Sequence, residues 1–360
     1  MKLVVFGLTI SSSWGNGHAT LWRGLTRALG ERGYHVVFYE KNVSWYAGNR
    51  DCMAPPGCEL VLYDDWADIA ARAARDLRDA EAGTVTSYCP DALAATNLVL
   101  DAPCRSVFYD LDTPVTLAAL DQGDVSYIGP RALRDFDLVL SYTGGRALDL
   151  LRERLGAKRA LPLYGHVDPL AHRPAPPVEA YRADLSYLGT YAADRQPALE
   201  RLFIEPARAR PHMRFCIGGA QYPPDFPWEP NISFVRHMPP PEHPAFFSSS
   251  RLQLNVTRRA MAAMGWCPSG RLFEAAACGA ATLSDVWEGL DGFFTPGEEI
   301  LLAETGDDVL AALDRGDAEL GRIGEAARAR VLRDHTSAHR ADELIAALES
   351  LGASSRLVEA

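Results

Sequence analysis

The residues from Pro268 to Gly279 carry the clearest indication of binding chemistry in this 360-residue chain. Ser269 can cap the start of a helix, and Gly279 suits the position just beyond its end. A helix start offers free backbone N–H groups to a phosphate, and Glu274, one turn in, can accept hydrogen bonds from a ribose diol. Together with Arg271, this pattern indicates a nucleotide-binding helix. The alternative is an ordinary solvated Arg–Glu pair.

A second candidate is the segment Gly15-Asn16-Gly17-His18, which follows the first strand-like run and opens a helix-like one. The glycines allow a tight turn, but their spacing is not G-x-G-x-x-G, and only Glu40 closes the second strand with an acid. A dinucleotide-binding fold is therefore disfavoured. A neutral imidazole at the start of a helix could act as a general base. The alternative is that His18 only caps or hydrogen-bonds the loop.

Two carboxylates, Asp110 and Asp112, follow the fifth strand-like run. Either one could orient a base, hold a substrate hydroxyl, or cap the turn at Thr113-Pro114, which is the commoner fate of Asp before a turn. The carboxyl ends of parallel strands share one edge of a sheet, so we expect Asp112 and His18 to converge.

Glycines and arginines follow the strand-like runs of the second half in the same way. A glycine there lets the backbone approach a ligand, and an arginine can hold a phosphate. One such arginine is usually a surface residue, but several at strand ends predict a donor-nucleotide site. With Ser269, Arg271 and Glu274, the candidates are Gly189, Thr190, Tyr191, Arg195, Gly218, His237 and Arg258.

These candidates require a scaffold of alternating strands and helices. Strand-like runs are expected at 2–8, 34–39, 59–63, 84–88, 105–109, 136–141 and 160–163, and again at 184–188, 213–218, 232–236, 252–256 and 281–284. Helix-like segments are expected at 19–32, 66–82, 145–155, 195–208, 309–332 and in the tail, 337–351. This alternation predicts α/β domains with parallel sheets covered on both faces. We expect domains at 1–168 and 183–336, a proline-rich linker at 169–182, and a helix at about 337–352 that packs back on the first domain.

Composition narrows the functional classes. A net charge of −11 and the absence of any basic run argue against a nucleic-acid partner. Seven cysteines without C-x-x-C spacing favour neither a disulfide framework nor a zinc site, and no metal is expected. The apolar opening is too short to span a bilayer, so no transmembrane segment is expected, and the cytoplasm is the expected compartment. The sequence does not specify the oligomeric state.

Several segments carry a resemblance to a known family. The main ones are 163–169 (Leu-Tyr-Gly-His-Val-Asp-Pro), 254–258 (Leu-Asn-Val-Thr-Arg) and 271–279, with support from 287–290, 293–300 and 335–336. On these residues the chain resembles the GT-B glycosyltransferases, most closely the CgeB-like group of the glycosyltransferase group 1 superfamily. The resemblance covers most of the C-terminal half and the N-terminal architecture.

The resemblance implies two Rossmann-like, doubly wound domains facing each other across a cleft. It implies no cofactor or metal, a nucleotide-diphosphate sugar as co-substrate, and a small-molecule or glycan acceptor with a hydroxyl or amine. Glu274 would bind the ribose, Arg258 or Arg271 would neutralise the diphosphate, and Gly15 to Gly17 would face the acceptor and phosphates. The chain departs from the family pattern eight positions upstream of Glu274, where Trp266 replaces the usual second Glu.

The stereochemical outcome stays open at this point. His18 with Asp112 or Asp110 would resemble the His–Asp dyad of inverting plant-type enzymes, whereas the Glu274 segment favours retention, which needs no such base. Two other functions remain as alternatives. A nucleotide-sugar 2-epimerase would need more catalytic carboxylates and histidines than we can place, and a non-catalytic GT-B binding module is favoured by Trp266.

Overall fold

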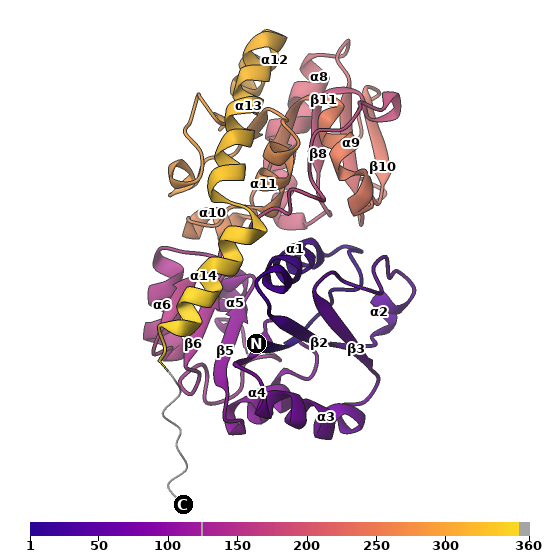
Figure 1. Ribbon diagram of the computed structural model, residues 1–360. Coiled ribbons are helices and arrows are strands. Elements are labelled where there is room, and N and C mark those ends of the chain that lie inside the picture. The colour runs from indigo at the N-terminus through magenta and orange to yellow at the C-terminus, as the bar shows by residue number, and fades with distance from the viewer. Residues whose placement is uncertain (124, 353–360) are drawn as a thin grey trace, which may run out of the picture. The chain divides into compact units, whose positions relative to one another are not determined.

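The computed structural model describes residues 1–123 and 125–352 of the chain (Figure 1). The chain forms two compact units. The first unit contains Met1–Tyr164 and the chain from Ser337 onward, and the second contains Gly165–Thr336. The segment 169–182, expected to be a separate linker, falls within the second unit.

The first unit is built on a seven-stranded parallel sheet with the order β3-β2-β1-β4-β5-β6-β7. Its strands are β1 (Lys2–Gly7), β2 (His35–Lys41), β3 (Cys58–Tyr63), β4 (Ala82–Thr86), β5 (Arg105–Asp110), β6 (Leu138–Ser141) and β7 (Ala160–Pro162). Val4 and Phe6 of β1 are completely buried, as expected for a central parallel strand covered on both faces. The strand order reverses beside β1, so the carboxyl ends of β1 and β4 flank the point where such folds bind ligands.

The helices of the first unit connect these strands. They are α1 (His18–Glu31), α2 (Ser44–Ala47), α3 (Trp66–Arg78), α4 (Ala92–Asp101), α5 (Thr113–Leu120), α6 (Arg146–Leu155) and the C-terminal α14 (Ser337–Glu349). Helix α14 packs against α1, where the Arg32 guanidinium donates two hydrogen bonds, of 2.5 and 2.7 Å, to Asp342. The tail helix therefore belongs to the N-terminal fold.

The second unit has a six-stranded parallel sheet with the order β10-β9-β8-β11-β12-β13. Its strands are β8 (Ala183–Leu188), β9 (Phe215–Gly219), β10 (Ile232–Arg236), β11 (Ser250–Asn255), β12 (Thr282–Ser284) and β13 (Leu301–Leu302). Its helices include α7 (Gln196–Leu199), α8 (Glu205–Ala209), α9 (His243–Ser248), α10 (Arg259–Met264), α11 (Gly270–Ala277), α12 (Gly306–Leu313) and α13 (Asp317–Asp334). Leu185, Phe203 and Phe215 are among the residues of its buried core.

The structure corrects several expected elements. The single helix expected at 309–332 is two helices, α12 and α13, with residues 314–316 between them. The short strand β13 was not expected, since two residues carry no recognisable pattern. The strand expected at 84–88 ends at Thr86, and Tyr88 lies beyond it with a left-handed φ of 65°.

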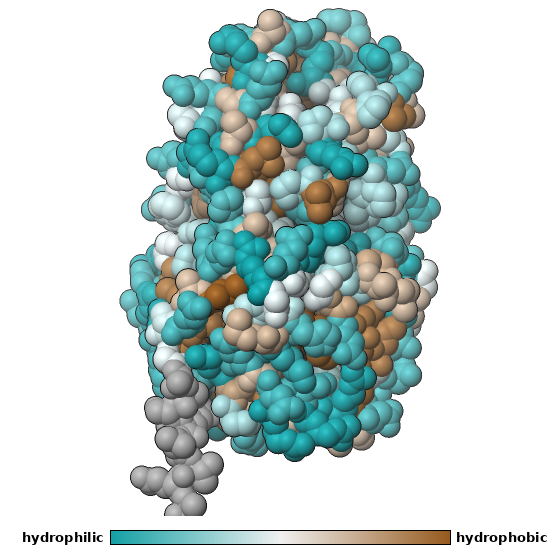
Figure 2. All heavy atoms as spheres, viewed as in Figure 1, coloured by the Kyte–Doolittle hydropathy of each residue, from teal (hydrophilic) through white to brown (hydrophobic). Residues whose placement is uncertain are grey.

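The surface drawn in Figure 2 is mostly hydrophilic, with hydrophobic residues in small separate groups. Within the described residues, none of the helices combines the length and the apolar character that crossing a bilayer requires. All seven cysteines are free thiols.

Candidate functional site

His18 and Asp112 meet at the carboxyl edge of the first sheet. His18 is the first residue of α1, and its Nε2 lies 3.8 Å from Asp112 Oδ2. Both side chains are partly exposed, at 21% and 16%. Asp112 occupies the N-cap position of α5, but its side chain makes no capping hydrogen bond. The carboxylate is therefore directed to the histidine and not to the helix that it precedes.

A tyrosine that the sequence did not single out completes this cluster. The Tyr88 hydroxyl donates to Asp112 Oδ2 at 3.1 Å. The Tyr88 ring stacks against His18 with centroids 6.4 Å apart and contacts Tyr127 at 5.2 Å. A left-handed backbone is costly for a tyrosine, and such strain is concentrated at functional sites. Neither residue type nor spacing reveals this conformation in the sequence.

Asp110 serves a different purpose from Asp112. It is completely buried and accepts hydrogen bonds from Thr116 Oγ1 at 2.9 Å and from the Asp112 backbone N–H at 3.2 Å. Its Oδ2 has no hydrogen-bond partner among the described residues. Burial raises the pKa of Asp110 to about 6. This carboxyl does not reach solvent, so it can act on a substrate only through the residues around it.

We expect Asp110→Asn to stabilise the protein at neutral pH. The pKa of Asp110 is higher in the folded chain than in the unfolded one, so its contribution to stability falls as the pH rises from about 4 to about 6. Asparagine cannot ionise and still offers an oxygen to Thr116. The free energy of unfolding near pH 8 should rise by on the order of 2 kcal/mol, and the dependence between about pH 4 and 6 should flatten. Urea unfolding near pH 4, pH 6 and pH 8 measures both effects, and a variant less stable than wild type near pH 8 would contradict the prediction.

The loop after β1 is held by an acid at the end of β2. Glu40 is completely buried and accepts hydrogen bonds from Ile10 N at 2.8 Å, Ser11 N at 3.0 Å and Ser11 Oγ at 2.5 Å. In a dinucleotide-binding fold the acid at this position would be available to a ribose. Here its oxygens bind the protein's own loop.

The two glycines of the Gly15–Gly17 segment have different backbone conformations. Gly15 adopts a left-handed φ of 61°, whereas Gly17 has φ −71° and a Cβ there would meet no atom within 4 Å. Of the two glycines expected to allow a tight turn, only Gly15 adopts a conformation that favours glycine. Asn16 Oδ1 accepts a hydrogen bond from the His18 backbone N–H at 3.0 Å. This bond helps fix the start of α1 and thus the position of His18.

In the second unit, three predicted arginines contact the end of β8 and the segment that follows it. Arg271 Nε donates to the Leu188 carbonyl at 3.3 Å, and Arg195 donates to the Thr190 carbonyl at 3.1 Å. Arg258 Nε donates to Asp194 at 3.1 Å. These guanidinium groups lie at the carboxyl edge of the second sheet, where α/β folds bind ligands, and two of them are paired with a carboxylate: Arg258 with Asp194 and Arg271 with Glu274.

The predicted glycines bring neighbouring strand ends together. Gly189 N donates to the Gly218 carbonyl at 2.9 Å, and a Cβ on Gly189 would lie 2.6 Å from the Tyr187 hydroxyl. His237 follows β10 with a left-handed φ of 52°, and its N–H donates to the Gly219 carbonyl at 2.7 Å. The absence of a side chain at Gly189 therefore has a packing reason within the protein. Next to it, the Tyr191 ring packs against Tyr222 with centroids 5.6 Å apart.

Helix α11 has the ends expected from its sequence. Ser269 is its N-cap, and its hydroxyl accepts a hydrogen bond from the Arg271 backbone N–H at 3.3 Å. Gly279 follows the helix with a left-handed φ of 78°. Arg271 and Glu274 form an ion pair one turn apart, with Nη1 2.5 Å from Oε2. The expected alternative of a solvated pair is wrong, because Glu274 is only 2% exposed.

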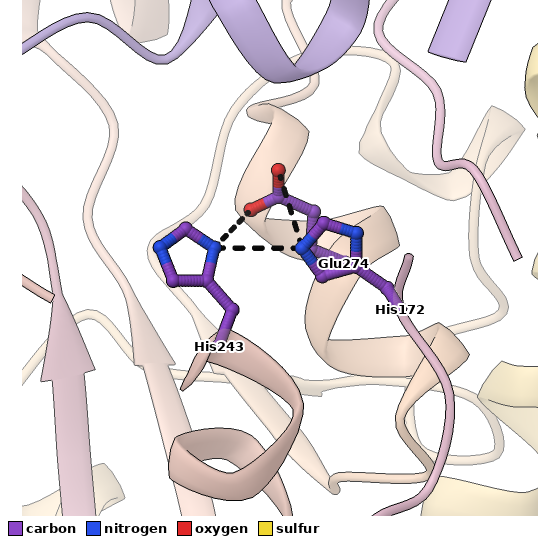
Figure 3. A group of neighbouring side chains, drawn as sticks. All are labelled: His172, His243 and Glu274. Atoms are coloured by element: carbon purple, nitrogen blue, oxygen red, sulfur yellow. Dashed lines mark hydrogen bonds and ion pairs between the residues drawn. The ribbon is translucent and has the colours of Figure 1, made fainter. Parts of the chain in front are cut away.

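Two further buried side chains surround Glu274 (Figure 3). His172 Nε2 lies 3.8 Å from Glu274 Oε1, and His243 Nδ1 lies 4.0 Å from Oε2. The two imidazoles face each other, with His172 Nε2 3.4 Å from His243 Nδ1. Burial alone would raise the pKa of Glu274, but the Arg271 guanidinium together with His172 and His243 outweighs burial, and the pKa falls to about 2. Glu274 is therefore a buried carboxylate whose charge is balanced by Arg271.

Trp266, at the position of the missing Glu, is a packing residue. A Cβ added to Gly289 would lie 2.3 Å from its indole ring, so the ring rests directly on that glycine. The indole also lies edge-on to Phe293, with ring centroids 6.3 Å apart. No carboxylate could occupy this place without losing these contacts.

Residues 195–346 match a family described as glycosyl transferase-like. No curated protein matches the sequence. The structure is similar to sucrose-phosphate synthase from Thermosynechococcus elongatus, with a TM-score of 0.72 and 14% identity over 99% of this chain and 100% of that one.

Two other similar structures were determined with nucleotides. HepE of Anabaena in complex with UDP-glucose has a TM-score of 0.67 and 11% identity over 97% of this chain and 100% of that one. An alpha-glucosyltransferase in complex with UDP and a 13-mer DNA has a TM-score of 0.70 and 14% identity over 97% and 99%. At these identities the likeness establishes the fold. The chain thus has the GT-B fold of glycosyltransferases, and the part of it that matches the glycosyl transferase-like family lies mostly in the second unit.

Proposed function

We propose that this protein is a glycosyltransferase that moves a sugar from a nucleotide-diphosphate donor to a hydroxyl or amine acceptor without a metal ion. The observation that carries the proposal is the convergence of Arg195, Arg258 and Arg271 at the carboxyl edge of the second sheet. This cluster lies largely within the domain that matches glycosyl transferases. Cations fixed beside the diphosphate would stabilise the charge that grows as the glycosidic bond breaks.

The role that we propose for Glu274 is more specific than ribose binding: it positions Arg271. Its carboxylate is buried, so its first task is to hold the Arg271 guanidinium in place for the diphosphate. The diol of the donor ribose is then recognised at the entrance of α11, beside this pair. The resemblance in the segment 271–279 supports this assignment and membership of the CgeB-like group.

For the first unit we propose that His18 is the general base for the acceptor and that transfer is inverting. The imidazole takes the acceptor proton, and the Asp112 carboxylate 3.8 Å away stabilises the imidazolium that forms. This arrangement favours the inverting alternative over retention, which needs no base. The anomeric configuration of the product, read by NMR, tests the outcome.

The acceptor is proposed to be a small molecule or glycan in a cytoplasmic setting, and the free thiols agree with a reducing compartment. The segment 42–56 is the proposed acceptor-facing part, because Asp51 and Cys52 anchor it to the Ser11 carbonyl after β1. Trp45 and Met53 are more than half exposed in this segment. A net charge of −11 disfavours DNA as acceptor, although one similar protein was determined with DNA.

A panel of UDP-, GDP- and dTDP-sugars, read by mass spectrometry against small acceptors and a DNA duplex, tests the proposal. We expect one donor to be consumed with formation of a glycosylated product. Binding without turnover of any donor would favour the non-catalytic module that Trp266 suggests, and conversion of an intact donor to its C2 epimer would favour an epimerase. Failure of every donor to bind would contradict the proposal.

We expect Tyr88→Phe to lower kcat by about tenfold, with little change in the KM for the donor. The variant keeps the ring contacts with His18 and Tyr127 but removes the hydrogen bond to Asp112 Oδ2, which is worth about 1.5 kcal/mol to a charged group. Tyr34→Phe, a buried tyrosine of the same unit outside this cluster, is the control. An unchanged kcat would show that Tyr88 has no part in orienting Asp112.

A further inference from the structure

The cluster of His172, His243 and Glu274 lies behind the proposed donor site, and two of its members have no role in the function proposed so far. The three residues come from distant parts of the chain. His172 is in the segment before β8, His243 begins α9, and Glu274 lies in α11. All three are buried, at 3%, 4% and 2% exposure.

The proton positions in this cluster follow from its hydrogen bonds. His243 Nε2 lies 3.2 Å from the Met238 carbonyl, which can only accept, so Nε2 carries the ring proton. Burial and the nearby Arg271 lower the pKa of His243 to about 3, so the ring is neutral and its Nδ1 is an acceptor. His172 Nε2 is then the donor to that nitrogen. Burial also lowers the pKa of His172, so both rings are neutral at physiological pH.

His172 is brought to this position by the Asp168 turn. The Asp168 carbonyl accepts hydrogen bonds from the backbone N–H groups of Ala171 at 3.0 Å and His172 at 2.9 Å. Asp168 Oδ1 accepts a third from Leu170 N at 2.9 Å. The segment 163–169, which carried part of the family resemblance, thus has a local structural purpose.

A pair of histidines and a glutamate is also a known ligand set for zinc, and these three offer donor atoms close enough together. The charges argue against it. Arg271 Nη1 lies 2.5 Å from Glu274 Oε2 and already balances the carboxylate. A divalent ion added there would leave an excess of buried positive charge, which is costly in a low dielectric.

We propose that His172 and His243 are positioning residues that hold Glu274 in the orientation that fixes Arg271 for the donor diphosphate. The Met238 carbonyl anchors His243, and His243 anchors His172. Both rings lie against the Glu274 carboxylate, His172 beside Oε1 and His243 beside Oε2. Glu274 can then keep Oε2 on Arg271, whose Nε donates to Leu188 at the end of β8. This inference rests on the donor site proposed above.

The test is calorimetric binding of UDP, GDP and dTDP to the full chain and its variants. His172→Leu and His243→Leu remove the paired nitrogens while keeping an apolar side chain, and we expect each to weaken the tightest nucleotide about tenfold. His172→Gln keeps an amide N–H near the Nε2 position and should bind within about twofold of wild type. Phe247→Leu is the control, because that buried ring packs edge-on against His243 in the same helix without joining the hydrogen bonds.

The outcomes separate this inference from the function on which it rests. Leucine variants that are folded and bind like wild type would overturn the positioning role and leave the donor site intact. Stoichiometric zinc in the purified protein, lost in both leucine variants, would overturn it in favour of a metal centre. A wild-type protein that binds none of the three nucleotides would overturn the donor site, and the positioning role with it.

Discussion

His18→Ala is expected to lower kcat by a factor of about 10² to 10⁴, which is the usual contribution of a general base. The donor should still bind, because every arginine of the proposed donor site lies in the second unit. Steady-state kinetics measures the rate, and calorimetry with the donor measures the binding. The physical reason is that no other described imidazole lies beside Asp112 to take the acceptor proton.

His35→Ala provides the matched control for this prediction. His35 begins β2 in the same unit and pairs with Glu59, but its side chain is 57% exposed and lies outside the His18 cluster. We expect this variant to keep wild-type kcat. If His18→Ala turned over at a near-normal rate with donor bound, His18 would not be the base, and a retaining mechanism would become the better explanation.

Arg271→Met is expected to abolish measurable donor binding and to cost about 3 kcal/mol of unfolding free energy, the lower end for a buried ion pair that loses one partner. The lower end applies because the side chain of Arg271 is 25% exposed, whereas the side chain of Glu274 is 3% exposed. The methionine fills a similar volume but leaves the Glu274 carboxylate without this guanidinium. Chemical denaturation and calorimetry measure the two effects.

The pH dependence of this variant has a definite sign. In the wild type the lowered pKa of Glu274 contributes stability above the unfolded value of about 4.5, and this is lost as the pH falls toward about 2. Without Arg271 burial dominates and the pKa rises. Arg271→Met should therefore lose stability as the pH rises above about 4.5. The wild type instead gains stability as the pH rises from about 2 to about 4.5.

A double variant separates stability from function at this site. Arg271→Met with Glu274→Leu leaves neither charge, so most of the lost unfolding free energy should return while donor binding does not. Arg208→Met is the control, since its pairs with Glu229 and Glu200 are at the surface and should cost under about 1 kcal/mol. Donor binding by Arg271→Met at wild-type strength would remove Arg271 from the diphosphate site.

Local sequence patterns were sufficient for the scaffold and for the ends of its key helix. Alternating apolar runs predict both parallel sheets, because a strand covered on both faces must be almost wholly apolar. Ser269 and Gly279 mark α11 correctly, since capping depends on the residues at the helix ends and on little else. The pairing of His18 with Asp112 also followed, because the carboxyl ends of parallel strands share one edge.

Other features depended on residues far apart in the chain. The sequence placed Glu274 as an available carboxylate, but the fold buries it behind Arg271 and beside His172 and His243, which are 102 and 31 positions away. It placed Tyr88 in a strand, but the backbone turns left-handed to bring its hydroxyl to Asp112. No local pattern encodes these results, because they are set by packing between strands and helices that only the folded chain brings together.

The sequence by itself thus determined a GT-B scaffold with cations after its second set of strands and a histidine after its first. Only the tertiary structure decided which of those groups are available. Glu274 became the buried support of Arg271, Asp110 a buried acid, and Asp112 the partner of His18. The physical reason is that a residue's type fixes the chemistry it can do, whereas burial and partners fix its charge and direction.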